Sequence, residues 1–106
     1  MALHRLRSWA EFKEALMRCQ ADCVFFAVED YPLGQPPISL RLLFTCGRDT
    51  YVFSDFARGD RMAQTGIPIR TDEGLPYVLK EDVEAFLERE LGRPMEVVDF
   101  TMTTFL

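Results

Sequence analysis

Apolar and polar positions alternate most regularly along Ile38–Cys46, where polar side chains separate apolar ones at nearly every second position. A period of two predicts a β-strand that buries one face. The pattern breaks at residues 47–49, which include a glycine, and a run rich in apolar residues resumes over 50–53. Two such runs joined by a short turn predict a β-hairpin, so we expect an antiparallel sheet at the centre of the fold.

Two further segments have the 3.6-residue period of amphipathic helices. The first covers about residues 8–21 and begins with Ser8 and Glu11, which are spaced as in a capping box. The second ends at Gly92 and Pro94 and has acidic residues in its first turn, where the helix dipole favours them. The apolar stripes consist of Trp9, Phe12, Leu16 and Cys19 in the first helix and of Val83, Phe86, Leu87 and Leu91 in the second.

The remaining apolar runs predict further strands. Residues 23–28 are apolar on both faces, 95–106 alternate, and 1–6 form a weaker candidate, whereas 54–76 are irregular apart from a short strand over 67–70. This order of elements predicts an α+β fold, a two-layer sandwich with both helices on one face of a mainly antiparallel sheet of four to five strands. A strand at 1–6 would bring the arrangement close to a ferredoxin-like fold with an inserted strand.

Length and composition indicate a globular chain. The 106 residues fit one domain covering 1–106, and an apolar fraction of 48% with 27% charged residues is ordinary for a folded protein. The longest apolar run, Cys23–Val28, is far shorter than the roughly 20 residues of a membrane helix. The charged N-terminus does not fit a signal peptide. We therefore expect a cytoplasmic protein that does not bind membranes.

The net charge of −5 is concentrated in the C-terminal third of the chain. Residues 71–106 carry nine acidic and three basic side chains, whereas residues 1–20 carry two acidic and four basic ones. Because an acidic surface repels phosphate backbones, we expect no nucleic-acid partner.

Cysteine and histidine are the side chains that most often serve in metal sites and nucleophilic catalysis. Strand pairing is expected to bring Cys19, Cys23 and Cys46 to one end of the sheet. His4 precedes a helix about 18 Å long, which would place the imidazole at the opposite end. The thiols are therefore interpreted as reduced, buried hydrophobic groups, and we expect neither a metal site nor a cofactor.

An anion-binding pocket is an alternative suggested by arginines that lie near glycines in the irregular segment. Guanidinium groups donate in a planar fork, so Arg58, Arg61 and Arg70 are the candidate ligand-binding residues. The segment has no glycine-rich phosphate loop, and its basic and acidic residues alternate. Pairing of these charges with one another at the surface therefore competes with ligand binding.

Acid–base catalysis is a weaker alternative. Carboxylates at Glu29, Asp30, Asp55 and Asp72 could act in catalysis only if burial or a charged neighbour shifted a pKa. All four are expected at the ends of elements or in polar loops, where water solvates them. We therefore do not expect catalysis by this chain alone, although a second subunit could complete an active site.

The C-terminal segment indicates function most strongly. From Phe100 to Leu106 the chain has no charge, proline or glycine, and proteins rarely leave such a strand exposed at a sheet edge. The strand is therefore expected to lie inside the sheet or beneath a second subunit. We expect a homodimer, or binding of another protein, through Phe100, Met102, Phe105 and Leu106. The sequence thus favours a non-catalytic interaction or self-associating module over a small-ligand or anion-binding accessory domain that uses the 55–73 loop.

Overall fold

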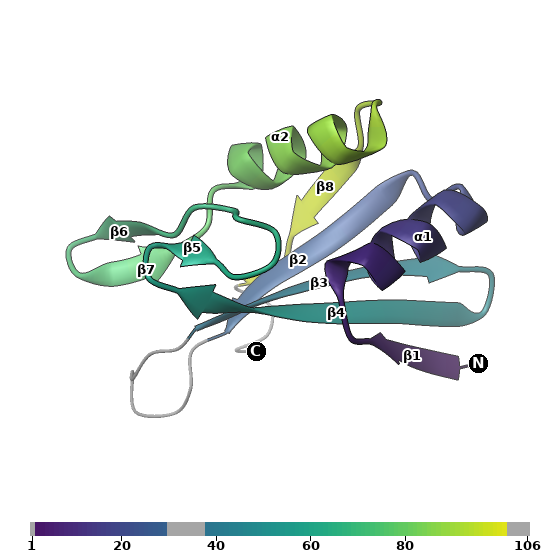
Figure 1. Ribbon diagram of the computed structural model, residues 1–106, viewed down its shortest axis with the longest axis horizontal. Helices are drawn as coiled ribbons and strands as arrows, with labels where there is room; N and C mark the ends of the chain where they lie inside the picture. Colours follow the sequence, from purple (N-terminus) through teal and green to yellow (C-terminus); the bar gives the residue numbers. More distant parts are fainter. Residues whose placement is uncertain (1, 30–37, 102–106) are drawn as a thin grey trace.

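Three consecutive antiparallel strands form the middle of the sheet in the computed structural model, which describes residues 2–29 and 38–101 (Figure 1). Leu43 of the central strand pairs with Phe25 on one side and with Val52 on the other. The predicted strand over 23–28 and the predicted hairpin are confirmed. The strands are β2 (Cys23–Glu29), β3 (Ser39–Cys46) and β4 (Asp49–Arg58).

Parallel strands complete the sheet at both edges. β1 (Ala2–Leu6) lies beside β4 and β8 (Glu96–Asp99) lies beside β2, which gives the strand order β1-β4-β3-β2-β8. The α+β class with a mixed, mainly antiparallel sheet is therefore confirmed. Because the first strand lies at an edge instead of between two other strands, the order departs from the ferredoxin-like arrangement.

Both helices cover the same face of the sheet (Figure 1), as predicted. α1 (Trp9–Cys19) begins at Ser8, whose hydroxyl accepts a hydrogen bond from the Glu11 N–H at 3.1 Å. α2 (Lys80–Leu91) ends at Gly92, where a φ of 75° is a left-handed conformation that glycine adopts without strain. Neither α1 nor α2 is long and apolar enough to cross a membrane.

The hydrophobic core lies between the two helices and the sheet face that they cover. The ring of Phe12 in α1 contacts the rings of Phe44 and Phe53, with centroid distances of 5.3 and 6.1 Å. Trp9 joins the helices, because its Nε1 donates to Glu90 of α2 at 2.8 Å. Burial of these aromatic rings removes a large apolar area from water and so contributes much of the stability of the sandwich.

The segment predicted to be irregular is ordered by short β pairings. β4 continues through a tight turn into β5 (Arg61–Met62), and β6 (Arg70–Asp72) forms a separate hairpin with β7 (Leu75–Tyr77). The strand predicted over 67–70 is reduced to an isolated bridge between Pro68 and Arg61, followed by β6. The β6–β7 hairpin projects from the end of the sandwich in Figure 1.

Candidate functional site

The sheet face opposite the helices carries a row of apolar side chains. Strand register aligns Val52, Leu43, Phe25 and Val98 across β4, β3, β2 and β8, and Arg5 of β1 ends the row. Alternation along each strand turns these side chains away from the core. We call this surface the helix-free face and define it by Leu3, Phe25, Leu43, Val52, Phe56 and Val98.

The burial of these residues shows that the helix-free face has its own apolar packing. Val52 and Ala27 are buried, yet neither belongs to the core cluster that the helices cover. Leu3 on β1 is 56% exposed and Phe56 at the far end of β4 is 46% exposed. The register places Leu3 beside Thr50 and Phe56 beside Ser39, so both lie at the rim of the face and outside the row. Exposed apolar side chains around a packed apolar row are typical of an interaction surface.

Phe100 extends this apolar surface past the end of β8. Its N–H donates to the Phe26 carbonyl at 3.0 Å, and its ring meets the Phe25 ring edge-on with centroids 5.9 Å apart. The Thr101 hydroxyl accepts a hydrogen bond from the Val28 N–H at 3.1 Å. Among the four predicted interface residues, Phe100 therefore adjoins the helix-free face, and Met102, Phe105 and Leu106 lie outside the described residues.

The strand β8 lies at the edge of the described sheet, where it pairs with β2. Of the two predicted locations, a position inside the sheet is therefore wrong for residues 96–99. Glu96 and Asp99 are both exposed and place negative charge near each end of this short strand. Charge on an edge strand discourages uncontrolled pairing with other chains.

Charged side chains at the two edges of the helix-free face have opposite signs. Arg5 on β1 and Glu96 on β8 are both exposed, and Glu96 accepts a weak hydrogen bond from the Cys23 thiol at 3.8 Å. Between the edges, Arg41 of β3 forms an ion pair with Glu29 of β2 at 3.0 Å. The face is therefore basic at the β1 edge, locally neutralised in the middle and acidic at the β8 edge.

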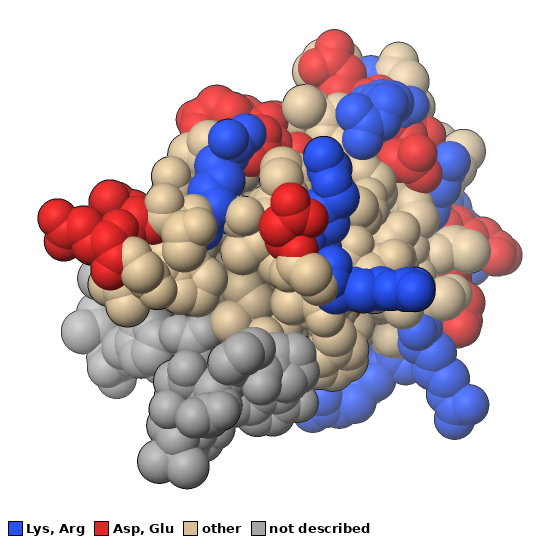
Figure 2. All heavy atoms as spheres, turned by 60° about the vertical axis from the view of Figure 1, so that its left-hand side comes forward, with Lys and Arg blue, Asp and Glu red and all other residues tan. Residues whose placement is uncertain are grey.

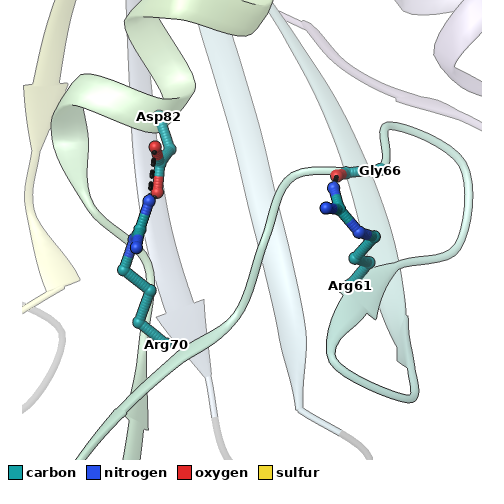
Figure 3. A network of polar contacts seen from close by, with 4 residues as sticks. All are labelled: Arg61, Gly66, Arg70 and Asp82. Carbon is teal, nitrogen blue, oxygen red and sulfur yellow. Dashed lines mark hydrogen bonds and ion pairs between the residues drawn. The ribbon is translucent and has the colours of Figure 1, made fainter.

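Two of the arginines predicted to bind an anion point to different protein partners (Figure 3). Arg70 donates to both carboxylate oxygens of Asp82 at 2.7 and 3.1 Å, and this bond raises the pKa of Arg70. Arg61 donates to the Gly66 carbonyl at 3.0 Å. One guanidinium group thus fastens β6 to α2, and the other closes the loop that follows β5.

The third predicted arginine, Arg58, lies opposite Arg61 in the β4–β5 ladder, and both residues are exposed. The structure therefore brings these two together, while Arg70 belongs to the separate β6–β7 hairpin. Figure 2 shows acidic and basic side chains interspersed over the surface that it presents. Mixed charge of this kind produces a weaker field for an anion than a purely basic pocket would.

Thiol and imidazole groups lie at the end of the sheet where β1 begins. A hydrogen bond with Cys46, followed in importance by burial, raises the pKa of Cys19, and Asp49 adds to the rise. His4 Nε2 lies 3.5 Å from an Asp49 carboxylate oxygen, and its ring stacks on Tyr51. The prediction that His4 lies at the other end from the thiols is wrong, because α1 runs back along β1 (Figure 1).

This cluster does not have the properties of an activated nucleophile. A raised pKa keeps Cys19 protonated near neutral pH, whereas a nucleophilic cysteine needs a lowered one. Burial, with help from Glu96, likewise raises the pKa of Cys23. Within residues 2–29 and 38–101, no group of three or more His, Cys, Asp or Glu side chains is arranged to hold a metal ion.

Asp55 of β4 is fully buried, so the prediction that water solvates its carboxylate is wrong. One carboxylate oxygen accepts hydrogen bonds from the N–H groups of Phe56 and Gln64, both at 3.0 Å. The other accepts from the N–H and the hydroxyl of Thr65, both at 2.8 Å. The chain after β5 folds back over β4 and surrounds the carboxylate with donors, which gives Asp55 a structural role.

The other carboxylates weighed for catalysis do not form a pair with Asp55. Glu29 is bound to Arg41, and Asp72 is exposed at the end of β6. Asp30 lies outside the described residues.

Comparisons of the chain with protein-family models, with curated proteins and with solved structures found no match.

Proposed function

We propose that this protein is a non-catalytic module that self-associates or binds another protein through the helix-free face, and that it acts in the cytoplasm. The observation that carries the proposal is the apolar row formed by Phe25, Leu43, Val52 and Val98 on a sheet face that neither helix covers. Its three free cysteines suit a reducing compartment.

The architecture explains why such a row calls for a partner. In a two-layer sandwich the helices bury one apolar face of the sheet, and the other face is normally polar. Here the central strand places half-buried Leu43 on the side away from the helices, between half-buried Phe25 and buried Val52. A further layer supplied by a partner would remove from water the part of this apolar surface that is still exposed.

The test replaces Leu43 with glutamate in the full chain and measures molar mass by light scattering at high micromolar concentration. We expect the wild type to associate and Leu43→Glu to lose association, because a charge cannot be buried unpaired in an apolar contact. Leu75→Glu is the matched control, since Leu75 is 69% exposed on the β6–β7 hairpin.

Leu3→Glu provides a second test that is independent of folding, because Leu3 is exposed at the rim of the same face. Circular dichroism verifies that each variant is folded. The proposal is wrong if Leu43→Glu and Leu3→Glu both behave like the wild type and like Leu75→Glu.

A small-ligand or anion-binding accessory role is the second candidate, favoured by the pairing of Arg58 with Arg61 across the β4–β5 ladder. If inorganic phosphate binds there, it should raise the unfolding midpoint of the wild type, and Arg58→Glu should abolish the rise. Arg48→Glu, in the β3–β4 turn, is the control of equal charge. Equal responses of the three proteins to phosphate would exclude the site.

A further inference from the structure

We propose that the partner of the helix-free face is a second copy of this chain. The two copies stack face to face with their strands aligned, and the β1 edge of each lies over the β8 edge of the other. This inference rests on the proposed function, because it names the partner and the geometry of the same surface. It follows from the position of β3, the order of the apolar row and the opposite charges at the two edges.

Pairing of two β8 edges into one continuous sheet is disfavoured by charge. An antiparallel pairing of two β8 strands related by a two-fold axis centres on Val97 or on Val98, because residues opposite one another must share a sheet face. The first register makes the two copies of Glu96 diagonal neighbours and the second does the same to the two copies of Asp99, so like charges lie close together in either ladder. Both Glu96 and Asp99 are exposed at the edge of the sheet, so their negative charges would meet directly at such a contact. Stacking through the face avoids this repulsion.

The apolar row is self-complementary about its central strand. β3 is the middle strand of the order β1-β4-β3-β2-β8, and it carries Leu43. A two-fold axis that runs along β3 between the two faces brings Leu43 of one copy against Leu43 of the other. The same rotation sets Val52 over Phe25 of the second copy, on both sides of the axis. Aligned sheets pack about 10 Å apart, which interdigitating side chains of this size fill.

Edge charge selects this axis over the other aligned packing. With the axis along the strands, Arg5 on the β1 edge lies over the β8 edge of the second copy and can reach its Glu96. With the axis across the strands, β1 would lie over β1 and β8 over β8, so each charged edge would meet an edge of the same sign. Electrostatic complementarity therefore fixes the orientation. Arg41, which lies on the same strand as the axis, is neutralised by its ion pair with Glu29.

The experiment exchanges the two charges in separate full-length proteins, Arg5→Glu and Glu96→Arg. Each variant alone juxtaposes like charges at both contacts, so its dimer should dissociate roughly tenfold or more readily than the wild type. A mixture of the two variants restores both attractive contacts in the mixed dimer. Native mass spectrometry should therefore show the mixed dimer well above its statistical share, with a dissociation constant close to that of the wild type.

Arg18→Glu and Glu88→Arg are the matched controls, since both positions are exposed on the helices. This control pair should mix only statistically. The arrangement is wrong if the mixture of Arg5→Glu and Glu96→Arg is also statistical. If Leu43→Glu still abolishes the wild-type dimer in that case, the proposed function survives without this geometry. A wild type that stays monomeric overturns both.

Discussion

The carboxylate of Asp55 accepts four hydrogen bonds of 3.0 Å or less from a short stretch of neighbouring chain. A neutral amide has one acceptor oxygen, so it cannot replace the second oxygen that Thr65 uses. Buried donors left without an acceptor cost free energy of unfolding, typically about 1–3 kcal/mol each. The order of the loop that contains Gln64 and Thr65 therefore depends on a single side chain.

We expect Asp55→Asn to lower the free energy of unfolding by about 3 kcal/mol, because at least one strong hydrogen bond to a charged acceptor is lost. Urea unfolding monitored by circular dichroism measures this change. Asp72→Asn at the exposed end of β6 is the control and should alter stability little. An Asp55→Asn protein as stable as the wild type would show that the carboxylate is not the organising group of this loop.

Cys19 gives a prediction of pH dependence. Its pKa is raised above the ordinary value of 9.0, chiefly by the hydrogen bond with Cys46, so the folded state holds the thiol proton more tightly than the unfolded state does. The resulting stabilisation is present below the unfolded pKa and is lost as pH rises through the folded pKa. Wild-type stability should therefore fall above pH 9.0, and Cys19→Ser should reduce that fall.

Thermal unfolding between neutral pH and pH above 9.0 compares the two proteins, and alkylation provides a second readout. Because the thiolate is the reactive form, iodoacetamide should modify Cys19 more slowly in the native protein than in urea at the same pH. Faster alkylation of the native thiol would mean that its environment lowers the pKa of Cys19 instead of raising it.

The roles of individual residues were the least predictable from sequence. The candidate arginines were predicted to share one irregular segment, whereas Arg58, Arg61 and Arg70 lie in β4, β5 and β6. The partners of Arg61 and Arg70, a carbonyl and the carboxylate of Asp82, depend on how distant segments meet. Asp55 was expected to be solvated because its surroundings in sequence are polar. Three of its four donor groups come from residues 9 and 10 positions further along, which no local pattern reveals.

At the scale of elements, local signals were sufficient for the two helices. The Ser8 cap, the apolar stripe and the glycine at the end of α2 each act within one or two turns. The first strand of the central hairpin was equally clear, because its alternation is long, whereas the second was predicted only over 50–53 and extends in the structure to Arg58. The strands β5, β6 and β7 contain two or three residues each, too few for a recognisable period.

The Ser8 cap leads to a prediction about α1. Ser8→Ala removes the acceptor for the Glu11 N–H, and we expect a loss of about 1 kcal/mol in the free energy of unfolding. Ser8→Asp should retain most of the stability, because aspartate caps equally well and also complements the helix dipole. Chemical denaturation of the three proteins tests this. Equal stability of Ser8→Ala and the wild type would mean that the cap is redundant.

At the scale of the whole molecule, the α+β sandwich with both helices on one face was predictable, but the strand order was not. Parallel pairing of β1 with β4 and of β8 with β2 joins segments distant in sequence. The predicted position of His4 was wrong for the same reason, because the prediction used the length of the helix but not the reversal of chain direction between β1 and α1. The helix-free face likewise becomes visible only when the register places Phe25, Leu43 and Val52 side by side.

The central claim is that the helix-free face is sequestered by association between copies of the chain. Sedimentation equilibrium of the wild-type protein over a dilution series from high to low micromolar concentration tests it most directly. We predict a reversible transition between the 12.3 kDa chain and a species of twice that mass. A mass of 12.3 kDa at every concentration would contradict the claim.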